Sequence, residues 1–258
     1  MTMTLTHRLD RTITIDAPPA VVFGFLTETR RWAAWWGAGS EIDARPGGLM
    51  KIRYPDGTEA VGEVLEVHPP ERIVFTYGYV SGVMIPPGGS RVTIELEAAG
   101  ASTRVRLAHE YHDAEVLDRH VQGWRYQLSL FANVVADEVF AGAADTVDAW
   151  FDAWAEPNAE ARHRALARIA SSDVRFRDRY SSIDNIGDLV GHIAGALQFM
   201  PGIRMSRAGG VRQCQGIVLA DFVARGADGV ERGGTNVFVF AADGRLKSVT
   251  GFMNANTT

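Results

Sequence analysis

The chain has 258 residues, of which 46% are hydrophobic, so it is long enough for one large domain or two domains of ordinary size. Its formal net charge of −5 argues against nucleic acid as a partner. The single cysteine, Cys214, excludes an internal disulfide framework. Because the sequence has no apolar run of about 18 residues and its start lacks the apolar core of a secretion signal, we expect a cytoplasmic protein without membrane contact.

The first half of the sequence predicts two short helices followed by a series of strands. Residues 11–16 alternate between polar and apolar side chains, which is typical of a strand, and the two prolines after Asp16 favour a helix start. The short helices are expected at residues 20–26 and 29–36. Turn signals then separate five predicted strands, at residues 49–54, 59–68, 72–79, 91–97 and 104–110.

A long helix is the clearest element that the sequence predicts. Apolar residues recur at steps of three and four from Leu117 to Val139, which makes one apolar stripe on a helix of about six turns or more. Asp113 is the expected N-cap of this helix. A curved antiparallel sheet has one apolar face to cover, and this helix can cover it.

The second half predicts another domain that combines helices with a sheet. A stretch of small residues near position 142 separates the halves, so we expect domains at residues 1–142 and 143–258. The helices are expected at residues 145–155, 159–170 and 186–200. The strands are expected at residues 174–180, 204–208, 213–225, 230–240 and 245–253. The resulting fold class is α+β in both domains.

Three polar residues of the second half are candidates for acid/base chemistry. Asp178 falls on the apolar side of a predicted strand, where desolvation would raise its pKa and suit it to proton transfer. The alternative is a carboxylate that ends the strand and pairs locally. Asp221 interrupts an apolar strand and lines either a cavity, an outer face or a dimer contact, and Asn236 is expected to point the same way.

The sequence predicts neither a metal site nor a bound cofactor. His109 and His112 stand at the end of an extended strand, where their side chains diverge, and no third ligand cluster lies nearby. The phosphate loop, the dinucleotide glycine fingerprint and the nucleophile elbow are also missing.

Large aromatic residues are numerous in the first half. They either enclose a cavity for an apolar ligand or fill an ordinary core. The candidate ligand-binding residues are Trp35, Trp36, Tyr54, Phe75, Tyr77, Tyr79, Trp124 and Phe131.

The first half resembles the helix-grip superfamily (SRPBCC, START and Bet v1-like), in the branch named for the activator of the Hsp90 ATPase. The residues that carry this resemblance are 11–23, 46–48, 56–57, 62–75, 103–107 and 123–124. The resemblance implies a curved antiparallel sheet that grips a long C-terminal helix, with a cavity between them for a hydrophobic small molecule. It implies no catalytic residues.

The second half is similar to the cone fold of the NTF2-like superfamily, of the SnoaL type. The match rests on residues 150–154, 174–178, 200–202 and 238–252. Asp178 falls near the general base of the ketosteroid isomerase branch. Trp150, Phe151 and Trp154 occupy the helix on which that branch carries a tyrosine, so the oxyanion would lack this hydroxyl donor. The resemblance also implies a homodimer formed through the sheet.

The sequence leaves three functions open. The first is binding of a small hydrophobic molecule in the helix-grip domain, with a second cavity in the cone. The second is a cofactor-free acid/base enzyme, of the isomerase, cyclase or hydrolase type, that uses Asp178 with Asp221 or Asn236. The third is a chaperone-associated interaction module, which the family name alone implies.

Overall fold

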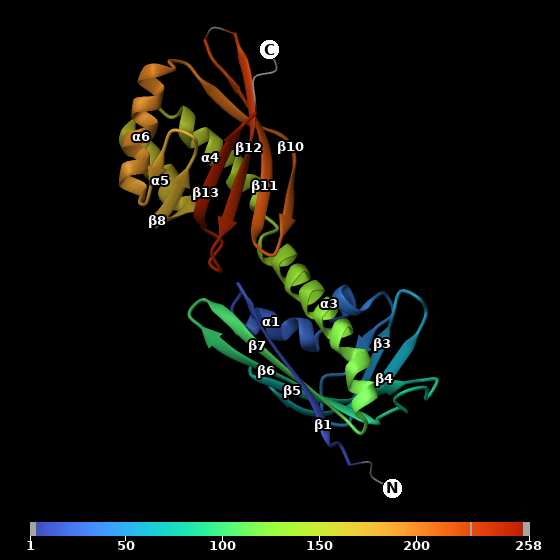
Figure 1. The fold of residues 1–258 in the computed structure, drawn as a ribbon. Coiled ribbons are helices and arrows are strands. Elements are labelled where there is room, and N and C mark those ends of the chain that lie inside the picture. Colours follow the sequence, from blue (N-terminus) through green and yellow to red (C-terminus); the bar gives the residue numbers. More distant parts are fainter. Residues whose placement is uncertain (1–3, 228, 255–258) are drawn as a thin grey trace. The chain divides into compact units, whose positions relative to one another are not determined.

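The computed structural model describes residues 4–227 and 229–254. The chain divides into two compact units, Met1–Ala136 and Asp137–Thr258 (Figure 1). This division lies a few residues before the boundary that the sequence predicts. Each unit has its own sheet and its own core, so the two are described separately.

The sheet of the first unit is antiparallel, with strand order β1-β7-β6-β5-β4-β3-β2. Two helices, α1 (Pro19–Thr27) and α2 (Thr29–Trp36), follow the first strand, as the sequence predicts. The strands are β1 (His7–Ile15), β2 (Glu41–Ile42), β3 (Leu49–Arg53), β4 (Glu59–His68), β5 (Arg72–Tyr79), β6 (Ser90–Ala99) and β7 (Ser102–Tyr111). The short strand β2 has no counterpart among the predicted strands because two residues show no alternation.

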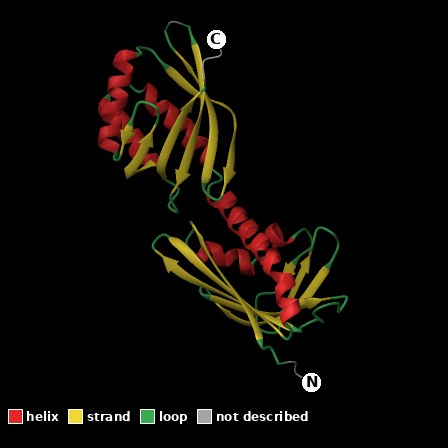
Figure 2. Cartoon of the chain, in the orientation of Figure 1, coloured by secondary structure: helices red, strands yellow, loops and turns green. Residues whose placement is uncertain are grey.

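Helix α3 (Ala114–Val139) is the long helix that the apolar stripe predicts. Asp113 caps it, since its Oδ1 accepts hydrogen bonds from the backbone N–H groups of Glu115 and Val116, at 2.7 and 3.2 Å. Figure 2 shows the helix lying across the sheet of the first unit. Its buried side chains include Trp124, Gln127, Leu128, Phe131 and Val135. The helix-grip fold is therefore confirmed.

The second unit packs three helices against a mixed sheet with strand order β10-β11-β12-β13-β8-β9. Strands β13 and β8 run parallel, and the remaining neighbours are antiparallel. The helices are α4 (Ala143–Ala155), α5 (Ala159–Ile169) and α6 (Ile186–Phe199). The strands are β8 (Ala170–Arg177), β9 (Ser182–Ile183), β10 (Arg204–Cys214), β11 (Ile217–Arg225), β12 (Glu231–Phe240) and β13 (Leu246–Met253). The α+β cone is confirmed as the fold of this unit.

Two predicted strand boundaries of the second unit are wrong. Strand β8 ends at Arg177, so Asp178 lies just beyond the strand rather than within it. The predicted strand at residues 213–225 is interrupted by a tight turn, at which Gln215 and Gly216 have φ of 48° and 82°. Positive φ at both central residues is typical of a type I′ hairpin turn. The dipeptide Asn-Gly would predict such a turn, whereas Gln-Gly does not.

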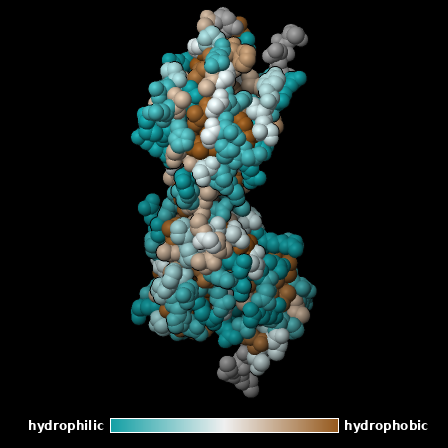
Figure 3. Space-filling model, turned by 90° about the vertical axis from the view of Figure 1, so that its left-hand side faces the viewer, coloured by the Kyte–Doolittle hydropathy of each residue, from teal (hydrophilic) through white to brown (hydrophobic). Residues whose placement is uncertain are grey.

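The surface and the helices give two further observations. Among the described residues, no helix combines the length and the apolar character needed to cross a lipid bilayer. The face of the molecule drawn in Figure 3 is mostly hydrophilic, with hydrophobic residues scattered between polar ones.

Candidate functional site

Aromatic rings fill much of the space between α3 and the sheet in the first unit. Trp35 packs against Trp36 with ring centroids 4.3 Å apart and against Phe131 at 4.7 Å. Phe75, which is fully buried, meets Trp32 edge to face at 5.7 Å. The indole of Trp35 donates to the carbonyl of Phe25 at 3.0 Å. Trp35, Phe75 and Phe131 thus form core rather than the wall of an open space.

Trp36 differs from its neighbours because its indole N–H has no acceptor. Its side chain is only 5% exposed, and its Nε1 has neither solvent contact nor a hydrogen-bond partner in the part of the chain that the structure describes. The ring lies edge to face with Tyr54 at 6.0 Å and with Trp124 at 5.7 Å. A buried donor without an acceptor costs about 1–3 kcal/mol, so the Trp36 indole N–H has a hydrogen bond to offer.

Two tyrosine hydroxyl groups belong to the same region, since Tyr54 packs on Trp36 and its hydroxyl meets that of Tyr77. They form a hydrogen bond of 2.9 Å with each other. One such bond uses one of the two O–H protons, so the pair keeps capacity for a further partner. Burial raises the pKa of both phenols above the ordinary value, so both are uncharged at neutral pH.

A buried histidine organises a second group of polar side chains. The Nδ1 of His109 accepts hydrogen bonds from the Tyr111 hydroxyl at 2.6 Å and from the Trp124 indole at 2.9 Å. Its Nε2 therefore carries the proton and donates to Ser90 Oγ at 2.8 Å. Ser90 in turn donates to the carbonyl of Tyr77 at 2.9 Å. Burial holds the pKa of His109 well below its usual value, which keeps the ring neutral.

His120 on α3 is the remaining polar group of this region. Its Nδ1 donates to the carbonyl of Val116 at 2.7 Å, so its Nε2 is free to accept from the Tyr79 hydroxyl at 3.1 Å. Desolvation lowers the pKa of His120 as well. Its ring lies 5.9 Å from His109 and 5.2 Å from Tyr111. The interior near these residues is thus polar but uncharged.

We call this set the tyrosine–histidine cluster. Its members are Trp36, Tyr54, Tyr77, Tyr79, Ser90, His109, Tyr111, His120 and Trp124. Sequence reasoning selects most of the aromatic members but considers His109 only as a metal ligand. Strand alternation places His109 and Tyr111 on the inner face, and this signal could have found them. Among the described residues, no group of three His, Cys, Asp or Glu side chains could hold a metal ion.

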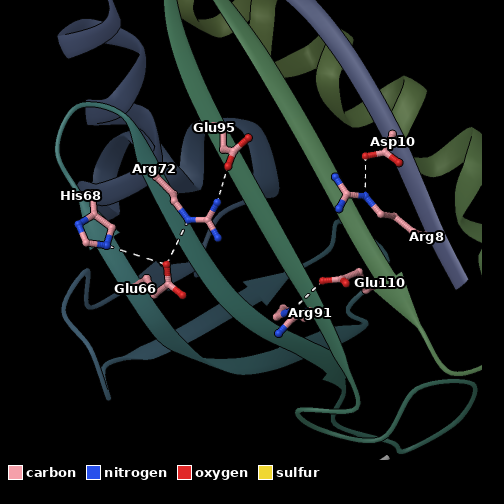
Figure 4. Close-up of polar contacts among 8 residues, drawn as sticks. All are labelled: Arg8, Asp10, Glu66, His68, Arg72, Arg91, Glu95 and Glu110. Atoms are coloured by element: carbon pink, nitrogen blue, oxygen red, sulfur yellow. Dashed lines mark hydrogen bonds and ion pairs between the residues drawn. The ribbon is translucent and has the colours of Figure 1, made fainter. Parts of the chain in front are cut away.

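The outer face of the same sheet carries a charged groove of about 370 Å³ (Figure 4). Arg91 and Glu110 form an ion pair of 2.7 Å across strands β6 and β7. Arg72 pairs with Glu95 and, at 3.1 Å, with Glu66. Since these arginines are already neutralised by carboxylates, an anionic ligand would have to displace them. The groove is therefore lined by solvent-exposed ion pairs between neighbouring strands and is not a candidate ligand site.

In the second unit, sheet register brings two of the predicted acid/base residues together. Asn236 pairs with Gly251, and Gly251 in turn lies beside Asp178. A Cβ atom built on Gly251 would lie 3.1 Å from Asn236 Oδ1 and 3.6 Å from Asp178 Cβ. Asn236 is 4% exposed, while Asp178 is half-buried and accepts a hydrogen bond of 2.8 Å from the backbone N–H of Tyr180.

The third candidate, Asp221, lies on the other face of the sheet. It pairs with Thr235, the neighbour of Asn236, and accepts a 2.5 Å hydrogen bond from the Thr235 hydroxyl. Its side chain is 50% exposed and meets Arg212 at 3.4 Å. The expectation that Asp221 and Asn236 point the same way is wrong, because an odd register offset turns their side chains to opposite faces.

A histidine of α6 joins the polar groups near Asp178. His192 Nε2 lies 3.0 Å from the hydroxyl of Ser181, whose carbonyl accepts from the N–H of Asp178 at 3.1 Å. Trp154 and Phe176 pack on the imidazole at 5.8 and 5.9 Å. The Nε1 of Trp154 is a second buried indole nitrogen without a partner among the described residues. Sequence reasoning does not select His192 as a site residue.

The chain is similar to one family model and to several solved structures. Residues 16–136 match the family model for Activator of Hsp90 ATPase homolog 1-like protein. An AHSA1-like protein of Rhizobium etli is 31% identical, with 53% of this chain and 86% of that chain covered and a TM-score of 0.43. A protein described as a putative isomerase of the SnoaL-like family, from Agrobacterium tumefaciens, is 24% identical, with coverage of 46% and 99% and a TM-score of 0.42. An Aha1 dimer from Colwellia psychrerythraea is 19% identical, with coverage of 48% and 91% and a TM-score of 0.42. No curated protein matches the chain.

Proposed function

Because the first unit belongs to the family of Activator of Hsp90 ATPase homolog 1-like proteins, we propose that it binds a small, uncharged and largely apolar molecule between α3 and the sheet. The molecule carries an oxygen atom that accepts a hydrogen bond from the indole of Trp36. The single observation that carries this proposal is the buried Trp36 N–H without an acceptor among the described residues.

The charge state of the cluster argues for an uncharged ligand. His109 and His120 are neutral because their pKa values are lowered, and Tyr54 and Tyr77 are neutral because theirs are raised. A charged ligand would lose its hydration without meeting a counter-charge in the cluster. Apolar ligand surface would instead contribute about 25 cal/mol per Å² buried, before ordering costs.

Native mass spectrometry of the freshly purified protein tests this proposal directly, because it reports any co-purified small molecule. The extracted molecule is then added back to protein labelled with ¹⁵N in its tryptophans. We expect the Trp36 indole resonance to shift on binding, and the Trp36→Phe variant to bind about three- to ten-fold more weakly. Trp32→Phe is the matched control, since the Trp32 indole already donates to the carbonyl of Lys51. Equal binding by both variants and the wild type would refute the proposal.

A second candidate function is proton transfer by Asp178 in the second unit. The observation in its favour is that Asp178 and the buried amide of Asn236 both lie beside Gly251, so a carboxylate and an amide are close together. Exchange of the α-protons of 1-indanone with D₂O, followed by NMR, measures proton abstraction without a known substrate. Asp178→Asn should abolish this exchange, and Asp221→Asn should leave it unchanged. Exchange that survives in Asp178→Asn would exclude Asp178 as the base.

A chaperone-associated role stays a prediction that the family description alone supports. A pull-down with the chain as bait, in which no large ATPase is recovered, would contradict it.

We further propose that the chain forms a homodimer through the outer face of the second unit's sheet. Apolar side chains gather there, with Ile217 and Phe252 48% and 56% exposed, and with Leu219 paired across strands with Val237. Val237→Arg should yield a monomer in light scattering, because it buries a charge at the centre of this face. Arg164→Glu, on the exposed side of α5, is the control. A wild-type monomer would contradict the proposal.

A further inference from the structure

The two halves of helix α3 are held to the first unit in different ways. From Trp124 onward the helix is anchored, since Trp124 is 5% exposed and its indole donates to His109 Nδ1 at 2.9 Å. Among the described residues 114–123, by contrast, none has a buried side chain. Burial of apolar surface therefore holds the second half of α3 more firmly than the first. We call residues 114–122 the N-terminal segment of α3.

One hydrogen bond joins a side chain of the N-terminal segment to the sheet. The Tyr79 hydroxyl of β5 donates to His120 Nε2 at 3.1 Å, and no other described residue of the segment makes such a bond to a strand. The ion pair of Arg119 with Glu115, at 2.5 Å, lies within the helix and is exposed, so it adds little. The contact between His120 and Tyr79 is therefore the polar attachment of this segment to the sheet.

Gly123 separates the N-terminal segment from the anchored half. Glycine is one of the least favourable residues in a helix interior, and a Cβ atom built on Gly123 meets no atom within 4 Å, so close packing does not require a glycine there. Isolated helices shorter than about 12–15 residues are marginally stable in water, and the N-terminal segment is shorter than this. If the segment leaves the sheet, it should therefore unfold rather than move as a rigid helix.

The surroundings of His120 determine how its attachment responds to acid. On its own helix, Nδ1 donates to the carbonyl of Val116 at 2.7 Å. The titratable side chains that face the ring from the sheet are Tyr77 and Tyr79 of β5 and His109 and Tyr111 of β7. None of these is a carboxylate, so a protonated His120 meets no counter-charge among them. Its Nε2 also can no longer accept the hydrogen bond from Tyr79.

Acid therefore favours the open form of the segment. Burial lowers the pKa of His120 in the closed form, whereas in the open form the imidazole is in water and its pKa returns to about 6.5. Below about pH 6.5 the open form takes up the proton first, so the ratio of open to closed rises by up to about ten-fold per pH unit. Above this pH the ratio does not depend on pH.

We propose that the N-terminal segment of α3 is an acid-responsive cover of the tyrosine–histidine cluster, which opens by local unfolding up to Gly123 when His120 takes up a proton. Opening brings Tyr79 and His120 into contact with solvent. The use of this opening as the entrance for a ligand rests on the proposed function, whereas the opening itself is a property of the chain without ligand.

Amide hydrogen exchange on the full, ligand-free chain tests this proposal. Exchange is measured at pH 7.5, 6.5 and 5.5, corrected for the intrinsic pH dependence, and compared between residues 118–122 and residues 124–135 of the same helix. At pH 7.5 we expect residues 118–122 to be about ten-fold or more less protected. Below about pH 6.5 their protection should fall by up to about ten-fold per pH unit.

Variants isolate each part of this cover. His120→Gln keeps an acceptor for Tyr79 but cannot be protonated, so the acid response of residues 118–122 should disappear. Tyr79→Phe should increase opening about three- to ten-fold at neutral pH, because the hydrogen bond is lost. Gly123→Ala should decrease opening about two- to five-fold and leave the acid response unchanged. His163→Gln, at an exposed position of α5, is the control and should change nothing in α3.

Three results would overturn the proposal, and two of them need no variant to fold. Equal protection of both halves of α3 at every pH would show that the helix opens only as a whole. Wild-type protection of residues 118–122 that does not change between pH 7.5 and 5.5 would exclude the acid response. An acid response that survives in His120→Gln would assign it to another group. A failure of ligand binding at Trp36 refutes the proposed function without changing these results, so the two proposals can fail separately.

Discussion

His109 gives a prediction whose size can be worked out from the structure. In His109→Phe, a ring of similar shape replaces the imidazole, but the hydroxyl of Tyr111 and the indole N–H of Trp124 lose their acceptor. Each buried donor left without a partner costs about 1–3 kcal/mol, so the first unit should lose about 2–6 kcal/mol of stability. Ser90 keeps its own bond to the carbonyl of Tyr77 and adds little to this loss.

The same substitution should change how stability depends on pH. Burial lowers the pKa of His109 and of His120 in the folded state, so the unfolded chain takes up protons first as the pH falls below about 6.5. The wild type therefore keeps its full stability above that pH and loses it on acidification. The loss reaches up to about 1.4 kcal/mol per pH unit for each histidine. His109→Phe removes one of the two histidine contributions. The free energy of unfolding of this variant should therefore fall about half as steeply with decreasing pH.

Amide hydrogen exchange with peptide resolution is the appropriate assay, because two units need not unfold in one transition. Exchange of β6 and β7 peptides reports on the first unit, while the strands of the second unit serve as an internal reference. His68→Gln, at an exposed position of β4, is the control. Unchanged protection of β7 at neutral pH, or an unchanged acid slope, would show that His109 does not hold this network.

Three further substitutions test local features of the fold, each by chemical denaturation. Arg162 is 1% exposed and donates to the backbone carbonyls of Glu156, Pro157 and Val190. Arg162→Met should therefore destabilise the second unit by about 3 kcal/mol. Arg164→Met, on the exposed side of α5, is the control and should have little effect. Asp113→Ala removes the N-cap of α3 and should lower the free energy of unfolding by about 1 kcal/mol. An unchanged denaturation midpoint would contradict this prediction. Gly123→Ala should stabilise α3 by about 0.5–1 kcal/mol, because a Cβ there meets no atom within 4 Å; a lower midpoint would contradict this.

The sequence predicted those elements of the fold whose signals are local and repeated. The stripe from Leu117 to Val139 and the cap at Asp113 located α3, because both depend on neighbours within a few turns. The sequence does not predict the turn at Gln215 and Gly216, since Gln-Gly is not a strong turn signal although both residues have positive φ. The predicted strand continues past Arg177, the last residue of β8, because alternation alone does not show where strand pairing ends.

The candidate sites were predicted less well, because they depend on which strands are neighbours. Most aromatic members of the first unit's cluster could be selected by their size. The role of His109 could not be predicted, because its hydrogen-bond partners Ser90 and Trp124 lie on a neighbouring strand and on α3.

In the second unit, the pairing register of β11 and β12 determines which polar side chains share a face of the sheet. Asp221 and Asn236 both interrupt apolar strands, so composition treats them alike. Asn236 pairs with Ala220 and Gly251 on the inner face, while Asp221 pairs with Thr235 on the outer face. Had β12 been shifted by one position against β11, the carboxylate would lie across from the amide, and an acid/base pair would be the natural interpretation. In the observed register, the Asn236 amide lies on the inner face and the Asp221 carboxylate on the outer face, so the two cannot act on the same group.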